Sequence, residues 1–342
     1  MSFFYHLYGL NVESDLALPE LRCRTAPRNH NSSVKLFLCD AFTHWPIETS
    51  AGESTLICEP AKNESVSSVR IEYFHAARCY RFLYRDGVAF ALDHDGTNVW
   101  GTWPPEMSLK DAAVYLLGPV FAFVLRLHGL VPLHASAAVV RGSAVAFVGP
   151  GGAGKSTIAA ALARKGYAIL GDDIAVLEEI SEEFWLRPAY AQVNLWPDSV
   201  SCLFGAKDAL PKLAPSSEWD KRFLNLDQHG FRFQTECAPL RCIFLLEGFS
   251  RAVEVARIDE ITPMDAFARL PANTYVSYGL TTKMRAREFQ ELGRLVHRVA
   301  IKRLTLGFSI DSITALGSFI EQALALEGSR QLQLESSYKG FS

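Results

Sequence analysis

The segment from Gly149 to Thr157 reads GPGGAGKST and carries the spacing Gly-x-x-x-x-Gly-Lys-Ser. Backbone N–H groups of such a loop cradle phosphates, the lysine reaches outward and the serine hydroxyl meets Mg²⁺. The flanking stretches AVAFV and STIAAALARKG predict a strand before the loop and a helix after it, which ends at Gly166. We therefore expect an α/β core that binds its ligand where the strand meets the helix N-terminus. The residues expected to bind the nucleotide are Gly149, Gly151, Gly152, Ala153, Gly154, Lys155, Ser156 and Thr157.

Two adjacent carboxylates, Asp172 and Asp173, follow the next predicted strand, YAIL. A hydroxyl that attacks a γ-phosphate needs a positioned carboxylate to take its proton. Paired aspartates can divide the work, because one can organise Mg²⁺ while the other faces the nucleophile. His134, in the stretch LVPLHAS, is a weaker candidate by itself, since a histidine there is as often a core side chain.

Composition excludes several classes of function. The chain has 342 residues and a formal net charge of -3, so it lacks the basic field of a nonspecific nucleic-acid binder. Its seven cysteines form no CxxC pair, which argues against a zinc site or a disulfide framework. The N-terminus shows no secretory signal pattern, and no membrane span is expected. We expect a cytoplasmic protein.

The hydrophobic pattern changes along the chain. Residues 1–105 alternate short apolar runs with polar turns, which predicts a smaller, mostly antiparallel β-rich domain. One hairpin is expected to turn through two residues, Asp86 and Gly87. The stretch from Ala112 to Leu125 predicts a buried helix kinked at Pro119. Residues 106–328 are expected to form the catalytic domain, and residues 329–342 a C-terminal tail.

The chain resembles the C-terminal catalytic domain of HPr kinase/phosphorylase, an α/β domain of the P-loop, PEP carboxykinase-like type. That family has a histidine on the strand before the loop, the Gly-Lys-Ser loop itself and an Asp-Asp pair after the following helix. Here the matching residues are His134 in LHAS, Lys155-Ser156 in GGAGKS and Asp172-Asp173 in GDDIAVL. The close match covers roughly residues 134–177.

The resemblance implies roles for these residues. Asp173 takes the proton of the substrate hydroxyl, Lys155 binds the β- and γ-phosphates of ATP, and His134 lies near the transferring phosphoryl group. Ser156 binds Mg²⁺, and the division of work between the paired aspartates then leaves Asp172 to organise the metal. Asp198, in NLWPDS, falls where the family places a magnesium-binding glutamate, although a turn aspartate after Pro197 explains it nearly as well.

Other strings are similar to a narrower branch, the HPr-kinase-like proteins encoded with ribosomal peptide natural products, notably the lasso-peptide kinases. These strings are YGLNVESDLALPEL, LLGPVFAFVLRLHGLVPLHASA and NLWPDS. This likeness implies that the acceptor is a serine of a precursor peptide. Lys221 and Arg222 could clamp a substrate carboxylate or a nucleotide phosphate, or lie on a solvated surface. The parent family further implies a homo-oligomer.

The sequence thus predicts a kinase that uses ATP and Mg²⁺ to phosphorylate a serine hydroxyl of a peptide, with no nucleic-acid or membrane partner. The alternatives left open are an HPr-type protein kinase, a small-molecule hydroxyl kinase, a carboxykinase and a nucleotide sensor without transfer activity. The absence of an Asn-Lys-x-Asp segment argues against a GTPase of the common type.

Overall fold

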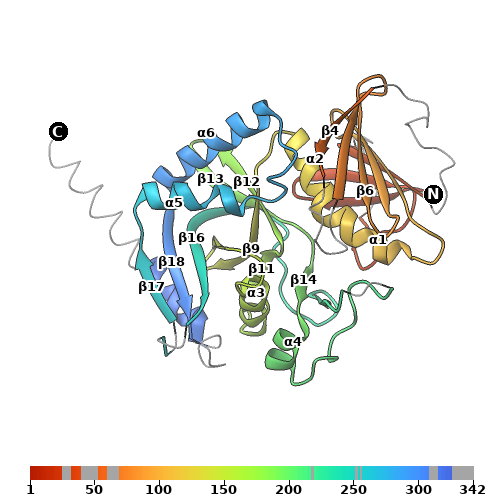
Figure 1. Cartoon of the computed structure of the whole chain (residues 1–342). Helices are drawn as coiled ribbons and strands as arrows, with labels where there is room; N and C mark the ends of the chain where they lie inside the picture. The colour runs from red at the N-terminus through yellow and green to blue at the C-terminus, as the bar shows by residue number, and fades with distance from the viewer. Residues whose placement is uncertain are drawn as a thin grey trace. The chain divides into compact units, whose positions relative to one another are not determined.

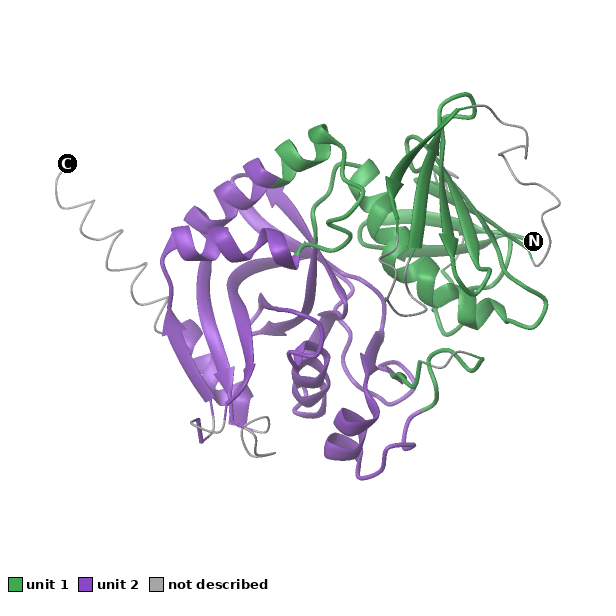
Figure 2. Ribbon diagram, in the orientation of Figure 1, with its two compact units in different colours: residues 1–132, 211–223, 274–288 green, residues 133–210, 224–273, 289–342 purple. Residues whose placement is uncertain are grey.

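The computed structural model describes residues 1–24, 32–39, 53–59, 69–216, 219–250, 253–254, 256–307 and 315–325. The chain divides into two compact units, which Figure 2 colours separately. The first unit comprises Met1–Pro132, Pro211–Phe223 and Thr274–Glu288. The second comprises Leu133–Leu210, Leu224–Asn273 and Phe289–Ser342. The tail expected at 329–342 lies outside the described residues.

The described part of the first unit holds an eight-stranded sheet in the order β1-β2-β3-β8-β7-β6-β5-β4 (Figure 1). Neighbouring strands run antiparallel, except that β3 is parallel to both β2 and β8. This agrees with the mostly antiparallel β structure expected for the N-terminal region. The strands are β1 (Phe3–Leu7), β2 (Leu10–Ser14), β3 (Val34–Cys39), β4 (Ser54–Cys58), β5 (Val69–Phe74), β6 (Cys79–Tyr84), β7 (Ala89–Asp93) and β8 (Asn98–Thr102).

The hairpin of β6 and β7 has a longer turn than expected. The Tyr84 N–H donates to the Val88 carbonyl at 2.9 Å, which leaves three residues in the loop rather than two. Only Gly87 in this loop has a positive φ, of 88°. The prediction of a two-residue turn was therefore wrong, because a glycine in the left-handed region also closes the three-residue loop that is next most common in hairpins.

The apolar stretch before residue 130 forms a helix interrupted at Gly118 and Pro119. Helix α1 (Leu109–Tyr115) passes into a π-helical segment, η1 (Leu116–Val120), and then into α2 (Phe121–Leu127). Pro119 has no N–H to donate, and the backbone at Gly118 leaves the helical region. The predicted kink is confirmed. No helix among the described residues is long and apolar enough to cross a membrane.

Aromatic packing ties this helical segment to the β sheet of the first unit. The Phe123 ring lies 4.9 Å from the Tyr80 ring and 5.2 Å from the Phe82 ring, both edge-on. The Phe121 ring lies 5.8 Å from the Tyr8 ring. The first segment of this unit therefore extends to Pro132, whereas the sequence pattern predicts a boundary between residues 105 and 106.

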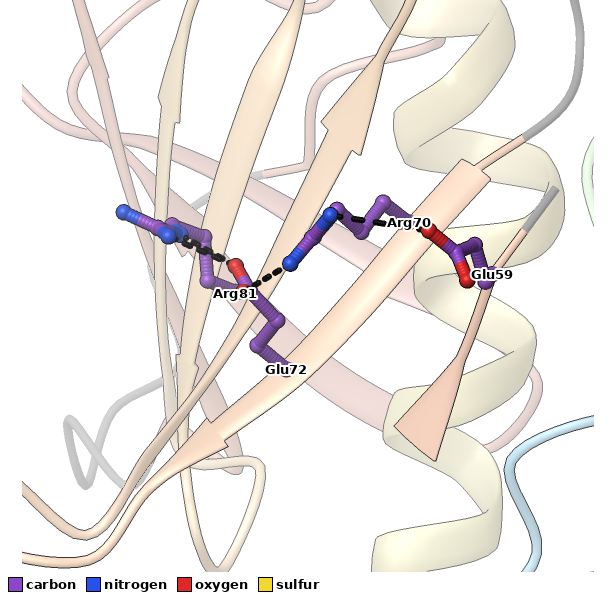
Figure 3. A network of polar contacts seen from close by, with 4 residues as sticks. All are labelled: Glu59, Arg70, Glu72 and Arg81. Atoms are coloured by element: carbon purple, nitrogen blue, oxygen red, sulfur yellow. Dashed lines mark hydrogen bonds and ion pairs between the residues drawn. The ribbon is translucent and has the colours of Figure 1, made fainter. Parts of the chain in front are cut away.

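Charged side chains on β5 and β6 form the network drawn in Figure 3. Glu72 accepts hydrogen bonds from Arg81 at 2.6 Å and from Arg70 at 3.0 Å, and Arg70 also contacts Glu59. Burial alone would raise the pKa of Glu72, but the two guanidinium groups hold it below its ordinary value. The network joins neighbouring strands by charge-assisted hydrogen bonds.

The second unit is built on a mixed sheet in the order β10-β9-β12-β13-β16-β18-β17, with β11 also paired to β9. Strands β10, β16 and β18 run parallel. The pairs β9–β10, β9–β11, β12–β13, β13–β16 and β17–β18 run antiparallel. Its strands are β9 (Pro132–Val140), β10 (Ser143–Val148), β11 (Ala168–Gly171), β12 (Ile174–Ile180), β13 (Glu183–Arg187), β16 (Ala238–Phe249), β17 (Ala256–Glu260) and β18 (Ala300–Leu306). Strands β14 (Gln192–Leu195) and β15 (Arg222–Asn225) form a separate pair.

The strand before the glycine-rich loop and the helix after it follow the prediction. Arg141 and Gly142, both with positive φ, form the two-residue turn between β9 and β10. Helix α3 (Lys155–Arg164) follows the loop, and Gly166 closes it with a φ of 88°. Apolar side chains of α3, including Ile158 and Leu162, are fully buried in the core of this unit. The remaining helices are α4 (Pro197–Phe204), α5 (Pro263–Arg269), η2 (Pro271–Asn273), α6 (Thr282–Arg298) and a helix at residues 315–325.

The N-terminal cap of α1 provides a test of the first unit. The Ser108 hydroxyl accepts from the Asp111 N–H, and the Asp111 carboxylate accepts from the Ser108 N–H at 2.9 Å. Asp111 also accepts from the Ser216 N–H. We predict that Ser108→Ala lowers the free energy of unfolding by about 1 kcal/mol, measured by urea denaturation. Ser108→Thr keeps the hydroxyl, so an equal loss in both variants would refute the cap.

Candidate functional site

The glycine-rich loop joins the carboxyl end of β10 to the N-terminus of α3. Gly152 and Gly154 have φ of 78° and 99°, a backbone region that only glycine adopts readily. A Cβ on Gly149 would lie 3.1 Å from the Leu246 side chain, so the loop packs closely on β16. By contrast, a Cβ on Gly151 or Gly152 would meet no atom within 4 Å. The middle of the loop is therefore open for a ligand to approach the backbone.

The other loop residues have defined contacts. The Ala153 N–H donates to the Pro150 carbonyl at 3.2 Å. The Lys155 ammonium is buried and donates to the carbonyls of Gly149 and Pro150 at 2.8 and 2.9 Å. The Thr157 hydroxyl lies 2.8 Å from that of Ser199 in α4. These contacts fold the lysine over the loop that the sequence analysis assigned to phosphate binding.

Asp172 is a buried carboxylate held by two strands of the second unit. Its Oδ1 accepts from the Ser136 hydroxyl on β9, and its Oδ2 accepts from the Asn194 N–H on β14 at 2.8 Å. The Ser156 hydroxyl on α3 lies near enough to this carboxylate to favour its ionised form. Burial and the adjacent Asp173 charge raise the pKa of Asp172 despite these hydrogen bonds.

Asp173 turns away from its neighbour through a strained backbone. The Ile174 N–H donates to the Asp172 carbonyl at 2.8 Å, which closes a three-residue turn around Asp173 at a φ of 68°. The positive-φ form of this turn is rare and strained. Asp173 Oδ1 lies 3.4 Å from His134 Nε2, and both side chains are partly exposed. Strain of this kind is concentrated at functional sites.

The structure therefore brings together four of the residues singled out by sequence: His134, Ser156, Asp172 and Asp173. One carboxylate is buried and bonded by neutral donors, while the other reaches solvent beside a histidine. The first carboxylate is suited to serve as a fixed oxygen ligand of a metal ion, and the second can exchange a proton with a bound hydroxyl.

Asp198 is exposed on the surface of the second unit. It lies in the first turn of α4, its side chain is 87% exposed, and its carboxylate pairs with the Lys207 ammonium at 2.7 Å. Among the described residues, no three His, Cys, Asp or Glu side chains form a cluster that could hold a metal ion. The assignment of Asp198 to Mg²⁺ stays a prediction, because equal spacing in sequence does not reveal which way this turn faces.

Lys221 and Arg222 belong to the segment of the first unit from Pro211 to Phe223. Arg222 donates to the Asp220 carboxylate at 2.8 Å, and the Lys221 ammonium lies 5.5 Å from the centre of the Trp219 ring. Both cations thus have contacts within their own segment. Their assignment as a clamp for substrate or phosphate stays a prediction.

Three residues of the site were missed by the sequence analysis: Ser136, Tyr190 and Asn194. Ser136 could have been found, because it lies two residues after His134 and so shares its face of the strand. Asn194 acts through its backbone N–H, so its residue type gives no sign of this contact in the sequence. Burial and the two aspartate charges raise the pKa of Tyr190, so its hydroxyl stays protonated beside them.

No protein-family model matches the chain, and no curated protein matches it. Among solved structures, it is similar to the HPr(Ser) kinase/phosphatase from Coxiella burnetii, with 14% identity over 61% of this chain and 97% of that chain. The TM-score is 0.29. So weak a likeness carries no argument about function, which must come from the residues of the site.

The raised pKa of Asp172 predicts that the metal-free protein loses stability as the pH rises. Because the folded value lies above the ordinary 3.8, the stability that Asp172 contributes is complete below that value and is lost as the pH rises through the folded pKa. We predict that the melting temperature of Asp172→Asn, relative to the parent, increases from about pH 4 to about pH 7 in chelator. A lost hydrogen bond alone would shift the two curves by a constant amount, and that result would contradict the prediction.

Proposed function

We propose that this protein is a kinase that transfers the γ-phosphoryl group of ATP to a serine hydroxyl of a peptide, with Mg²⁺ as cofactor. The observation that carries the proposal is the pairing of Asp173 with His134 beside the contact of Asp172 with Ser156. A protein that only binds nucleotide has no need of a second, solvent-reaching carboxylate at this place.

The residues fit both ATP and Mg²⁺. The open middle of the glycine-rich loop and the N-terminus of α3 offer backbone N–H groups to phosphates. The Ser156 hydroxyl and the Asp172 carboxylate are the oxygen ligands that Mg²⁺ prefers. A cation there would neutralise part of the charge that develops on the phosphates. It would also relieve the burial cost of Asp172.

The protein's own residues then perform alignment and proton transfer. The acceptor serine oxygen forms a bond to the γ-phosphorus, the bond from that phosphorus to the β–γ bridging oxygen breaks, and ADP leaves. The hydroxyl proton passes to the Asp173 carboxylate. Lys155 supplies a positive charge to the β- and γ-phosphates, and His134 orients Asp173 near the transferring group.

A peptide acceptor is the finer part of the proposal. It is supported by the strings shared with the lasso-peptide branch, which imply a serine of a precursor peptide. Lys221 and Arg222 are proposed to contact the substrate or a nucleotide phosphate. The sheet of the first unit is proposed to position the peptide.

Intact-mass analysis tests the activity directly. The protein would be incubated with Mg-ATP and, separately, peptides with internal or terminal serines, free serine and HPr. The proposal predicts a gain of one phosphoryl mass on a peptide. A gain only on HPr, or only on free serine, would show that the acceptor is not a peptide of this kind. Nucleotide binding without any phosphorylated acceptor would favour a nucleotide sensor without transfer activity.

Removing the proposed base should separate binding from transfer. We predict that Asp173→Asn keeps its affinity for Mg-ATP but loses about 10²- to 10⁴-fold in the single-turnover rate of transfer. Lys155→Ala should lower both the affinity and the rate. Asp208→Asn, an exposed aspartate of the same unit, serves as the control. Equal rates for Asp173→Asn and the parent would remove Asp173 from this role.

A further inference from the structure

Strand β9 contacts both aspartates with side chains on one face. His134 and Ser136 are two residues apart, and residues at this spacing point to the same side of a strand. His134 lies beside Asp173, and Ser136 donates to Asp172. Ser136 is paired across the sheet with Phe147, two residues before the loop begins at Gly149. Strand β9 thus holds both carboxylates in a fixed position relative to the same loop.

The bonds to Asp172 leave room for a further ligand. An ionised carboxylate has about four lone-pair sites, and two hydrogen bonds reach this one, from the Ser136 hydroxyl and the Asn194 N–H. Both donors come from strands, and each fixes one bond to a different oxygen. Ser156, whose hydroxyl lies near this carboxylate, is the proposed partner of Asp172 in holding Mg²⁺. The carboxylate is therefore oriented before any cation binds.

We infer that Ser136 is a positioning residue that orients the Asp172 carboxylate for Mg²⁺. The inference rests on the proposed function, because it assigns the metal to Asp172 and Ser156. Ser136 is fully buried between Ala135 and Ala137, which are also fully buried, and so it cannot touch the substrate. It acts only through the aspartate that it bonds.

Removing the hydroxyl isolates this role. Ser136→Ala deletes one oxygen atom and should lower the affinity of the nucleotide-bound protein for Mg²⁺. Loss of such a supporting bond costs about 10- to 100-fold in metal affinity. The measurement is isothermal titration of Mg²⁺ into the protein saturated with a non-hydrolysable ATP analogue. The affinity for the analogue in chelator should not change.

Ser14→Ala is the matched control. Ser14 is equally buried, and its hydroxyl donates one hydrogen bond, to the Leu16 carbonyl in the first unit. This variant should lose a similar amount of stability and keep the parent affinity for Mg²⁺. An equal loss of Mg²⁺ affinity in both variants would show a general effect of destabilisation and would overturn the inference.

A double-mutant cycle with Asp172→Asn completes the test. If Ser136 acts through Asp172, adding Ser136→Ala to Asp172→Asn should leave the remaining Mg²⁺ affinity unchanged. Additive losses would overturn the inference. Failure of the parent itself to bind Mg²⁺ with the analogue would instead refute the proposed function. Parent binding with no effect of Ser136→Ala would refute the positioning role alone.

Discussion

Two carboxylates on adjacent residues repel each other, and the rest of the site depends on how the chain separates them. Asp172 is buried among hydroxyl and amide donors, whereas Asp173 reaches solvent beside His134. The turn at Asp173, with its positive φ, sends the two side chains into these different surroundings. Like charges in unlike environments are the usual means by which one site keeps a fixed anion and a proton acceptor together.

The sheet of the second unit supplies the fixed frame for this separation. Strand β9 contacts both aspartates, its neighbour β10 leads into the glycine-rich loop, and the loop packs on β16 through Gly149. Rigid strands hold side chains more accurately than loops do. The groups proposed to bind phosphate, to bind the metal and to accept the proton are thus all held by one sheet. Catalysis by alignment requires such fixed relative positions.

Local signals predicted much of this arrangement. The Gly-Lys-Ser loop, its flanking strand and helix, and the kink at Pro119 each depend on residues close in sequence. Contacts over longer separations were missed, since Ser136 and Asn194 meet Asp172 from 36 and 22 residues away. The exposure of Asp198 was missed for a related reason, because spacing does not state which way the first turn of α4 faces.

The most direct test of the account is the position of the metal. A crystal structure of the protein with Mn²⁺ and a non-hydrolysable ATP analogue would locate the ion by its anomalous scattering. The account predicts an ion bound by the Ser156 hydroxyl and the Asp172 carboxylate, with Asp173 outside its coordination sphere. An ion coordinated by Asp173 and not by Asp172 would contradict the division of roles on which the mechanism rests.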